Sequence, residues 1–280
     1  SGRYGLSSKD TTPEQIAAIY ENRSIPFFTV GITDDVTHLS LDIPSIHPTA
    51  PEDIVSCKFW GLGGDGTVSA TKNAIKIIGN HTDMTAQGYF EYDSKKSRGL
   101  TISHLRFGRS PIRSAYLIHN ADFVACHNPV YLHKYDMVQE LKDGGTFLLN
   151  FHFQEPPAEA VDGTAKMGTS AETGLTAGTD ATADTGMAER ADAAAKTGAA
   201  AGTHAAMAQE LDAYLPRAMK AYMAAHGIRL YVIDALGIGK EIGLNNKIST
   251  ILQAAFFAVS GLLPAEDAKK WMFQAAEKSY

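Results

Sequence analysis

Residues 61–66 carry four glycines, in the pattern Gly61-x-Gly63-Gly64-x-Gly66. They follow a strand-like apolar run and precede a run with helical spacing, which is the context in which such a pattern is meaningful. Glycines let backbone N–H groups approach an anion closely, and the N-terminus of the following helix adds a favourable dipole. The sequence therefore predicts a turn that binds a phosphate or a pyrophosphate.

Two other interpretations of this turn stay open on the residues alone. A nicotinamide or flavin dinucleotide site would need an acidic residue about 20 positions further on, at the end of the second strand. Glu91 and Asp93 are the nearest candidates, although they lie somewhat far along, and the following Lys95 and Lys96 suit phosphate better. The turn could also serve only the close packing of a strand against a helix, because a lone glycine motif is a weak signal.

A second group of candidate residues is basic. Arg106, Arg109 and Arg113 lie close together in sequence, and guanidinium groups can bind carboxylates or phosphates. We favour salt bridges between domains of a larger protein as their role. The ten histidines show no metal-binding spacing, and no Ser, His and acid grouping has the context of a nucleophile. The sequence therefore predicts no catalytic centre in this chain.

The composition excludes several classes of protein. The chain has 280 residues, of which 44% are hydrophobic and 20% are charged, as in a globular protein. Its net charge of −6 and its scattered basic residues argue against nucleic acid as a partner. No apolar run reaches the roughly 20 residues that span a bilayer, and residues 1–25 are too polar for a secretory signal. We expect a cytoplasmic protein without a membrane partner.

The two cysteines, Cys57 and Cys126, lie in apolar strand-like runs. A disulfide between them is possible, but two buried free thiols fit a reducing cytosol better. Two thiolates cannot hold a four-iron cluster, which needs four. We therefore expect any electron-transfer centre to lie outside this chain.

Strands and helices alternate along most of the chain, which predicts a doubly wound α/β fold with a mostly parallel sheet, of the Rossmann or flavodoxin type. The expected helices are near residues 12–22, 68–78, 129–139, 211–225, 234–242, 249–259 and 265–280. The expected strands are near residues 27–32, 54–60, 87–92, 100–107, 121–126, 145–151 and 228–233. Residues 33–53 have no clear period and are interpreted as a linker.

Residues 156–207 differ in composition from the rest of the chain. They consist mostly of Ala, Gly, Thr, Asp, Glu and Met, without an aromatic residue or an isoleucine. Such a segment cannot bury enough surface to offset the entropy lost on ordering. We interpret it as a low-complexity insertion within one fold.

Several long runs resemble the gamma region of pyruvate:ferredoxin (flavodoxin) oxidoreductases. The runs are FWGLGGDGTV (59–68), KNAIKIIG (72–79), QGYFEYDSKKS (87–97), HLRFG (104–108), GGTFLLN (144–150) and QAAFF (253–257). The opening residues 2–9, GRYGLSSK, resemble the end of the preceding domain. The resemblance implies that residues 1–52 are a remnant of that domain with a linker. Residues 53–280 would then be one gamma-type domain with the insertion.

The resemblance also implies an activity. The family oxidatively decarboxylates pyruvate on thiamine diphosphate, passes electrons through 4Fe-4S clusters to ferredoxin or flavodoxin, and forms acetyl-coenzyme A. The thiamine diphosphate and the clusters are expected on other domains of the same polypeptide, in an enzyme expected to be a homodimer. This chain alone should not oxidise pyruvate.

Coenzyme A is the ligand that the resemblance assigns to this domain. The implied contacts are Gly63, Gly64, Asp65, Gly66, Thr67 and Lys95. Ser249 is also implied, at a position where the family has an asparagine, and a further contact is expected beyond Tyr280. The rival hypotheses are a dinucleotide-binding dehydrogenase domain and a non-enzymatic module that docks neighbouring domains.

Overall fold

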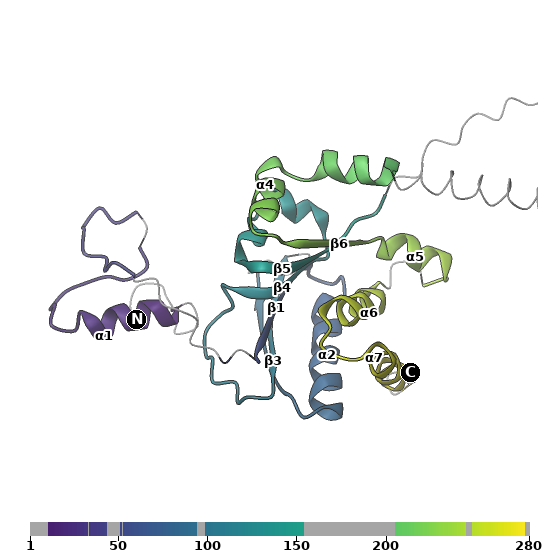
Figure 1. Cartoon of the computed structure of the whole chain (residues 1–280), viewed down its shortest axis with the longest axis horizontal. Helices are drawn as coiled ribbons and strands as arrows, with labels where there is room; N and C mark the ends of the chain where they lie inside the picture. Colours follow the sequence, from purple (N-terminus) through teal and green to yellow (C-terminus); the bar gives the residue numbers. More distant parts are fainter. Residues whose placement is uncertain are drawn as a thin grey trace, which may run out of the picture. The chain divides into compact units, whose positions relative to one another are not determined.

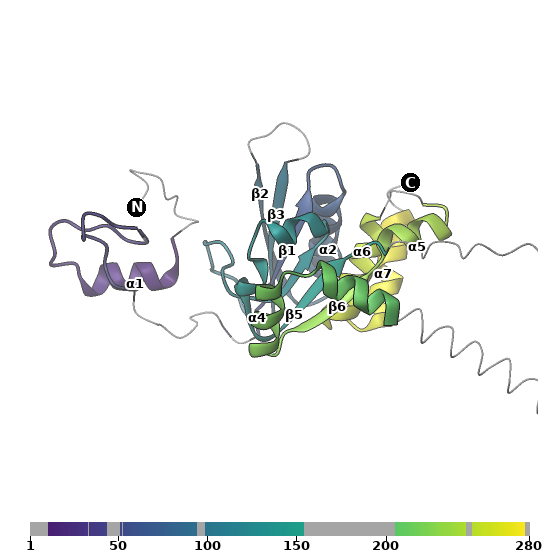
Figure 2. The ribbon, with the colours of Figure 1, turned by 90° about the horizontal axis from the view of Figure 1, so that it is seen from above.

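A computed structural model describes residues 11–32, 34–43, 51, 53–93, 99–153, 205–244 and 248–277. The chain divides into two units, and each is treated separately. One comprises residues 1–152 with 216–280, and the other residues 153–215. The first unit contains the sheet and all the helices and strands labelled in Figures 1 and 2.

The centre of the first unit is a six-stranded sheet in the order β2-β3-β1-β4-β5-β6. The strands are β1 (Val55–Leu62), β2 (Thr85–Tyr92), β3 (Leu100–Gly108), β4 (Ala121–Cys126), β5 (Leu141–Asn150) and β6 (Arg229–Ile233). Strands β1, β4, β5 and β6 are parallel, whereas β3 is antiparallel to both β1 and β2. The mostly parallel sheet is as the sequence predicts, with the β2–β3 hairpin as its one reversal.

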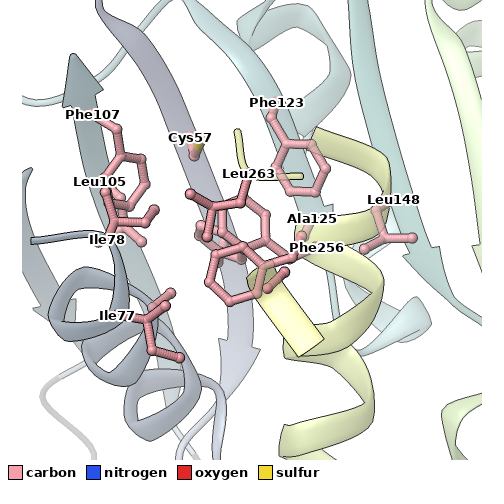
Figure 3. Packing of buried hydrophobic residues seen from close by; sticks show 14 residues of the cluster. Cys57, Ile77, Ile78, Leu105, Phe107, Phe123, Ala125, Leu148, Phe256 and Leu263 are labelled. Carbon is pink, nitrogen blue, oxygen red and sulfur yellow. The ribbon is translucent and has the colours of Figure 1, made fainter. Parts of the chain in front are cut away.

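One face of the sheet is apolar and is covered by helices α2 (Thr67–His81), α6 (Ser249–Ser260) and α7 (Ala265–Glu277). Phe256 of α6 lies at the centre of this core (Figure 3), with its ring 5.0 Å from that of Phe59 and 5.2 Å from that of Phe123. Ile77 and Ile78 of α2 are buried in the same cluster. Burying each such side chain contributes about 1.5–3 kcal/mol, so this layer holds α2 and α6 firmly against β1.

The opposite face of β1 carries polar side chains, because successive residues of a strand point to opposite faces. Lys58 is buried and its Nζ lies 2.5 Å from Glu140 Oε1. On β3, His104 hydrogen-bonds to Glu91 at 2.5 Å. Short 3-10 helices η1 (Pro129–His133) and η2 (Met137–Glu140) contact this side of the sheet, and α4 (Arg217–Ala225) contacts η2.

Most predicted elements are confirmed to within a few residues, and local signals explain several of them. Helix α1 (Pro13–Glu21) begins with a capping box, in which Thr12 and Gln15 bond each other's backbone N–H groups. Helix α4 ends at Ala225 with His226 as its C-cap, and Gly227 follows with φ 62°, as expected for a glycine after a helix. Helix α5 (Ala235–Glu241) begins at Asp234, whose carboxylate accepts from the Gly237 N–H.

Three local predictions are wrong. Residues 27–32 form no strand and contribute a single bridge, Thr29 to Ser40, because this segment pairs with no strand of the sheet. The helix expected over residues 129–139 is instead η1 and η2, because the backbone of Asp136 leaves the helical region between them. The helix expected over residues 211–225 breaks at Pro216, before which residues 205–214 are helical. Proline disfavours helical geometry in the residue before it.

Two other predictions fall on residues that the structure does not describe. The low-complexity segment lies almost wholly in residues 154–204, outside the described part of the chain. The linker expected over residues 33–53 is described only in part. The division of the chain into residues 1–52 and 53–280 therefore stays a prediction.

Candidate functional site

The glycine turn connects the carboxyl end of β1 to the start of α2. Gly64 and Gly66 have φ angles of 95° and 87°, in the left-handed region that only glycine enters without strain. A Cβ on Gly61 would overlap the Thr67 side chain, so the strand and the helix can approach each other only with glycine at position 61. The turn therefore requires glycine at these positions for both conformation and space.

Asp65 closes the turn from inside. Its carboxylate accepts hydrogen bonds from the Leu62 N–H at 2.7 Å and from the Thr67 N–H at 2.8 Å. The Gly63 N–H donates to the Gly99 carbonyl at 2.7 Å, and the Asp65 N–H donates to the Leu62 carbonyl at 2.9 Å. These four backbone donors are occupied, and a negative charge sits within the turn.

Other backbone donors of the turn have no partner among the described residues. They are the N–H groups of Gly64, Gly66, Val68 and Ser69. All lie at the N-terminus of α2, a helix of 15 residues whose dipole places partial positive charge there. An anion at this position would receive hydrogen bonds without displacing any existing one.

Ser249 is brought to the same place by α6. A Cβ on Gly66 would lie 2.7 Å from the Cβ of Ser249 and 3.2 Å from its hydroxyl oxygen. The N-termini of α2 and α6 therefore meet at Gly66. The two helices are also joined by a bond from Asn73 Nδ2 to Gln253 Oε1 at 3.3 Å. The structure thus brings together the turn and Ser249, which are far apart in sequence.

Thr67 lies behind the turn, because its side chain points into the interior. It is 1% exposed, and its hydroxyl lies 2.7 Å from Nδ1 of His127. His127 is itself buried, and desolvation lowers its pKa to about 4 while the charge of Asp65 opposes this shift. The imidazole is therefore neutral at physiological pH. With its N–H bonded to Asp65 and its hydroxyl to His127, Thr67 supports the turn from inside.

A series of hydrogen bonds runs from His127 along the carboxyl ends of the parallel strands. His127 donates its N–H to the Trp60 carbonyl at 2.9 Å, and its own carbonyl accepts from Asn150 Nδ2 at 3.0 Å. Asn150 Oδ1 in turn accepts from the Ala235 N–H at 3.1 Å. In open α/β sheets, ligands bind outside this edge of the sheet.

The three arginines do not form one site. Arg106 is buried, and it donates to Gln87 Oε1 at 3.0 Å and to the Tyr116 carbonyl at 2.8 Å. Arg109 forms an exposed ion pair with Asp83 at 3.4 Å. Since Arg106 is engaged within the fold, the hypothesis that the cluster forms interdomain salt bridges is wrong for this residue.

Arg113 lines a cavity of about 440 Å³ that lies at the opposite end of β1 from the glycine turn. Its other lining residues are Pro51, Ile54, Ser110, Pro111, Ser114 and Tyr116. Because Ile54 precedes β1 and the glycine turn follows it, this cavity is separate from the candidate site.

The other residues named from the sequence divide into described and undescribed ones. Lys95 and Lys96 lie in residues 94–98, outside the described part of the chain. Glu91 is described and is bonded to His104 on β3, which separates β2 from β1. Cys57 and Cys126 are confirmed as free and buried. Within the described residues, no cluster of His, Cys, Asp or Glu side chains could hold a metal ion.

Sequence reasoning missed His127 and Asn150 as parts of the site. In the sequence the histidines show neither a metal-binding spacing nor a catalytic grouping, and Asn150 is one residue of an expected apolar strand. Their common signal is position, because each stands at or just after the carboxyl end of a strand parallel to β1. Among the described residues, no helix is both long enough and apolar enough to cross a membrane.

Comparison with known proteins identifies relatives along the whole chain. The model of the family "Pyruvate ferredoxin/flavodoxin oxidoreductase" matches residues 56–279. The chain is 42% identical over 283 residues to the pyruvate:ferredoxin oxidoreductase of Moorella thermoacetica, an alignment that covers all of this chain and 20% of that protein. It is 41% identical over 284 residues to the pyruvate-flavodoxin oxidoreductase of Enterobacter agglomerans, with the same coverage. The chain thus spans about a fifth of the length of these relatives.

Among solved structures, the chain is similar to the pyruvate oxidoreductase subunit PORC of Thermotoga maritima. The TM-score is 0.46 at 15% sequence identity, and the superposition covers 82% of this chain and 86% of that one.

Proposed function

This chain belongs to the pyruvate ferredoxin/flavodoxin oxidoreductase family, and from this premise we propose that it is the domain that binds coenzyme A in such an enzyme. The whole enzyme would oxidatively decarboxylate pyruvate and transfer the acetyl group to coenzyme A. The role of this domain would be to bind coenzyme A at the glycine turn and to present the thiol to a neighbouring domain. The acetyl group would be generated on that domain.

The observation that carries the proposal is the pair of helix N-termini that meet at Gly66. The backbone N–H groups of Gly64, Gly66, Val68 and Ser69 are without partners in the described structure, and Ser249 adds a hydroxyl beside them. Such an arrangement suits the phosphate groups of coenzyme A. We assign Gly63–Thr67 and Ser249 to this binding site, with Lys95 as its proposed basic partner.

The strand order argues against a nicotinamide or flavin dinucleotide. In the Rossmann fold that binds these dinucleotides, the strand next to the first strand is parallel to it and ends in the acidic residue that binds the ribose. Here the neighbour of β1 on that side is the antiparallel strand β3. Glu91 lies one strand further away and is bonded to His104. The non-enzymatic alternative, a docking module, predicts no ligand at the turn.

The described residues do not fit an iron–sulfur cluster. The chain has two cysteines, and both are buried and free in the sheet. Electron transfer through clusters is therefore assigned to other parts of the full-length polypeptide, where ferredoxin or flavodoxin would accept the electrons. We propose that thiamine diphosphate also binds there, as the family resemblance implies. We propose that the full enzyme is a cytoplasmic homodimer.

Calorimetric titration of the 280-residue chain with coenzyme A, desulfo-coenzyme A and NADH tests the proposal. We expect saturable binding of both coenzyme A forms and none of NADH. Gly66→Ala should weaken coenzyme A binding about tenfold, because a Cβ at a left-handed φ costs roughly 1–2 kcal/mol and would also contact Ser249. Gly79→Ala in the same helix is the matched control, because a Cβ there meets open space.

Three outcomes would contradict the proposal. Binding of NADH would favour the dinucleotide hypothesis, and the absence of binding of all three ligands would favour the docking module. Equal coenzyme A affinity in Gly66→Ala and Gly79→Ala would remove the turn from the site. In the full-length enzyme, Lys95→Ala should raise the coenzyme A requirement and leave the affinity for pyruvate unchanged. An unaltered requirement would remove Lys95 from the proposal.

A further inference from the structure

His127 stands on a rigid part of the fold directly behind the glycine turn. It is the first residue after β4, and its backbone is bonded to β1 through Trp60 and to β5 through Asn150. Its ring packs edge-on against Phe59, with centroids 6.1 Å apart. The backbone of His127 is therefore held by the strands on both sides of β4, and its ring packs against β1.

The contact of this ring with the turn is one hydrogen bond. Nδ1 lies 2.7 Å from the Thr67 hydroxyl, which has no other partner in the described part of the chain. Thr67 is packed between this ring and the backbone of Gly61, and its N–H binds the Asp65 carboxylate. A displacement of Thr67 would therefore move both Asp65 and the first turn of α2.

A purely structural role explains this histidine poorly. Nε2 is buried and has no partner among the described residues, and leaving a buried polar group unpaired costs stability. An apolar side chain of similar size would avoid this cost. What it would lose is the bond that orients Thr67.

We propose that His127 is a positioning residue of the glycine turn, which acts through the Thr67 side chain to hold the start of α2 in its anion-binding conformation. The inference rests on the proposed function, because the anion is taken to be coenzyme A. His127 itself does not touch the ligand. Its effect is to keep the N–H groups of Gly64 and Gly66 in place before the ligand arrives.

Calorimetric titration with coenzyme A compares four variants of the 280-residue chain. His127→Phe and Thr67→Val should each weaken binding about fivefold, the amount expected from the loss of one net hydrogen bond. His127→Asn keeps a polar atom near the Nδ1 position and should bind within about twofold of the unsubstituted chain. The double variant His127→Phe/Thr67→Val should bind no more weakly than either single variant, because both remove the same contact.

His104→Phe is the matched control for loss of stability. His104 is also a buried, hydrogen-bonded histidine of this sheet, but its partners are Glu91 and the Ile118 N–H. This variant should lose stability and keep its coenzyme A affinity within about twofold. If His127→Phe binds coenzyme A as the unsubstituted chain does, or if His127→Asn is as weak as His127→Phe, the positioning role is overturned.

Amide hydrogen exchange gives a measurement that does not depend on coenzyme A. In His127→Phe, exchange at Asp65 and Thr67 should accelerate at least fivefold relative to the strands. If exchange at Asp65 and Thr67 is not accelerated, the positioning role is overturned whether or not coenzyme A binds. If exchange is accelerated but the unsubstituted chain binds no coenzyme A, the proposed function fails and the positioning role stands.

Discussion

Acid should destabilise this fold through His127, because protonation of its ring is strongly disfavoured in the folded state. The pKa of the ring is about 4 in the folded chain, lowered from 6.5 by desolvation. Between these two values the unfolded chain binds the proton and the folded chain does not. Stability is therefore fully present above pH 6.5 and is lost as the pH falls toward 4.

The two pKa values set the size of the effect. A difference of one pKa unit corresponds to about 1.4 kcal/mol, so the whole shift is worth about 3 kcal/mol. At pH 5 the His127 contribution alone should have lowered the free energy of unfolding by about 2 kcal/mol relative to pH 7.5. His104, whose pKa is also lowered mainly by desolvation, acts in the same direction. Glu140, whose pKa is raised mainly by desolvation, opposes it.

The assay compares urea unfolding of the unsubstituted chain and of His127→Asn between pH 5 and pH 7.5, followed by tryptophan fluorescence. The difference between the two curves isolates His127, because the other titrating groups are common to both. We expect the free-energy difference to change by about 2 kcal/mol over this range. Curves that stay parallel within about 0.5 kcal/mol would refute the assignment of a buried, neutral His127. Adding His104→Asn should flatten the remaining slope further.

Three other predictions follow from the described structure. Gly61→Ala should lower the free energy of unfolding by about 2 kcal/mol, because the new methyl group would overlap the buried side chain of Thr67. Urea titration measures this loss, and a loss under about 0.5 kcal/mol would contradict the prediction. Burial raises the pKa of Cys126 to about 12 and that of Cys57 well above its usual value, so neither thiol should react with a thiol reagent at pH 8 until guanidinium unfolds the chain. Lys58→Met should cost about 2 kcal/mol by leaving the partly buried Glu140 unpaired, whereas Lys58→Met/Glu140→Leu should recover most of that loss; equal losses would show that the pair is not coupled.

The sheet was predictable because its strands have strong local signals. Residues 121–126 and 228–233 are mostly apolar and include β-branched and aromatic residues, and β4 and β6 match them to within one residue. The 3-10 helices and the break at Pro216 were less predictable, because they depend on single backbone positions. The direction of β3 was not predictable from its own residues. An antiparallel strand and a parallel one share the same alternation of side chains.

The part of the candidate site that is formed by consecutive residues could be predicted from the sequence, whereas the parts contributed by distant segments could not. The glycine turn is visible in six consecutive residues, but Ser249 was placed there only by resemblance to the family. His127 joins the site through strand pairing, since Trp60 pairs with Cys126 and His127 comes next. Contacts between residues 60 or more positions apart, such as Thr67 with His127, follow from strand order, which the local pattern does not specify.

The charge of Asp65 would repel a phosphate group bound at the glycine turn. Its carboxylate already occupies two of the backbone donors and keeps a negative charge inside the turn. At a separation of about 5 Å and an effective dielectric constant of 20, two unit charges repel each other by about 3 kcal/mol. The partial charges at the N-termini of α2 and α6 offset part of this repulsion. A phosphate group would therefore need a further cation, and this is the role that the proposal gives to Lys95.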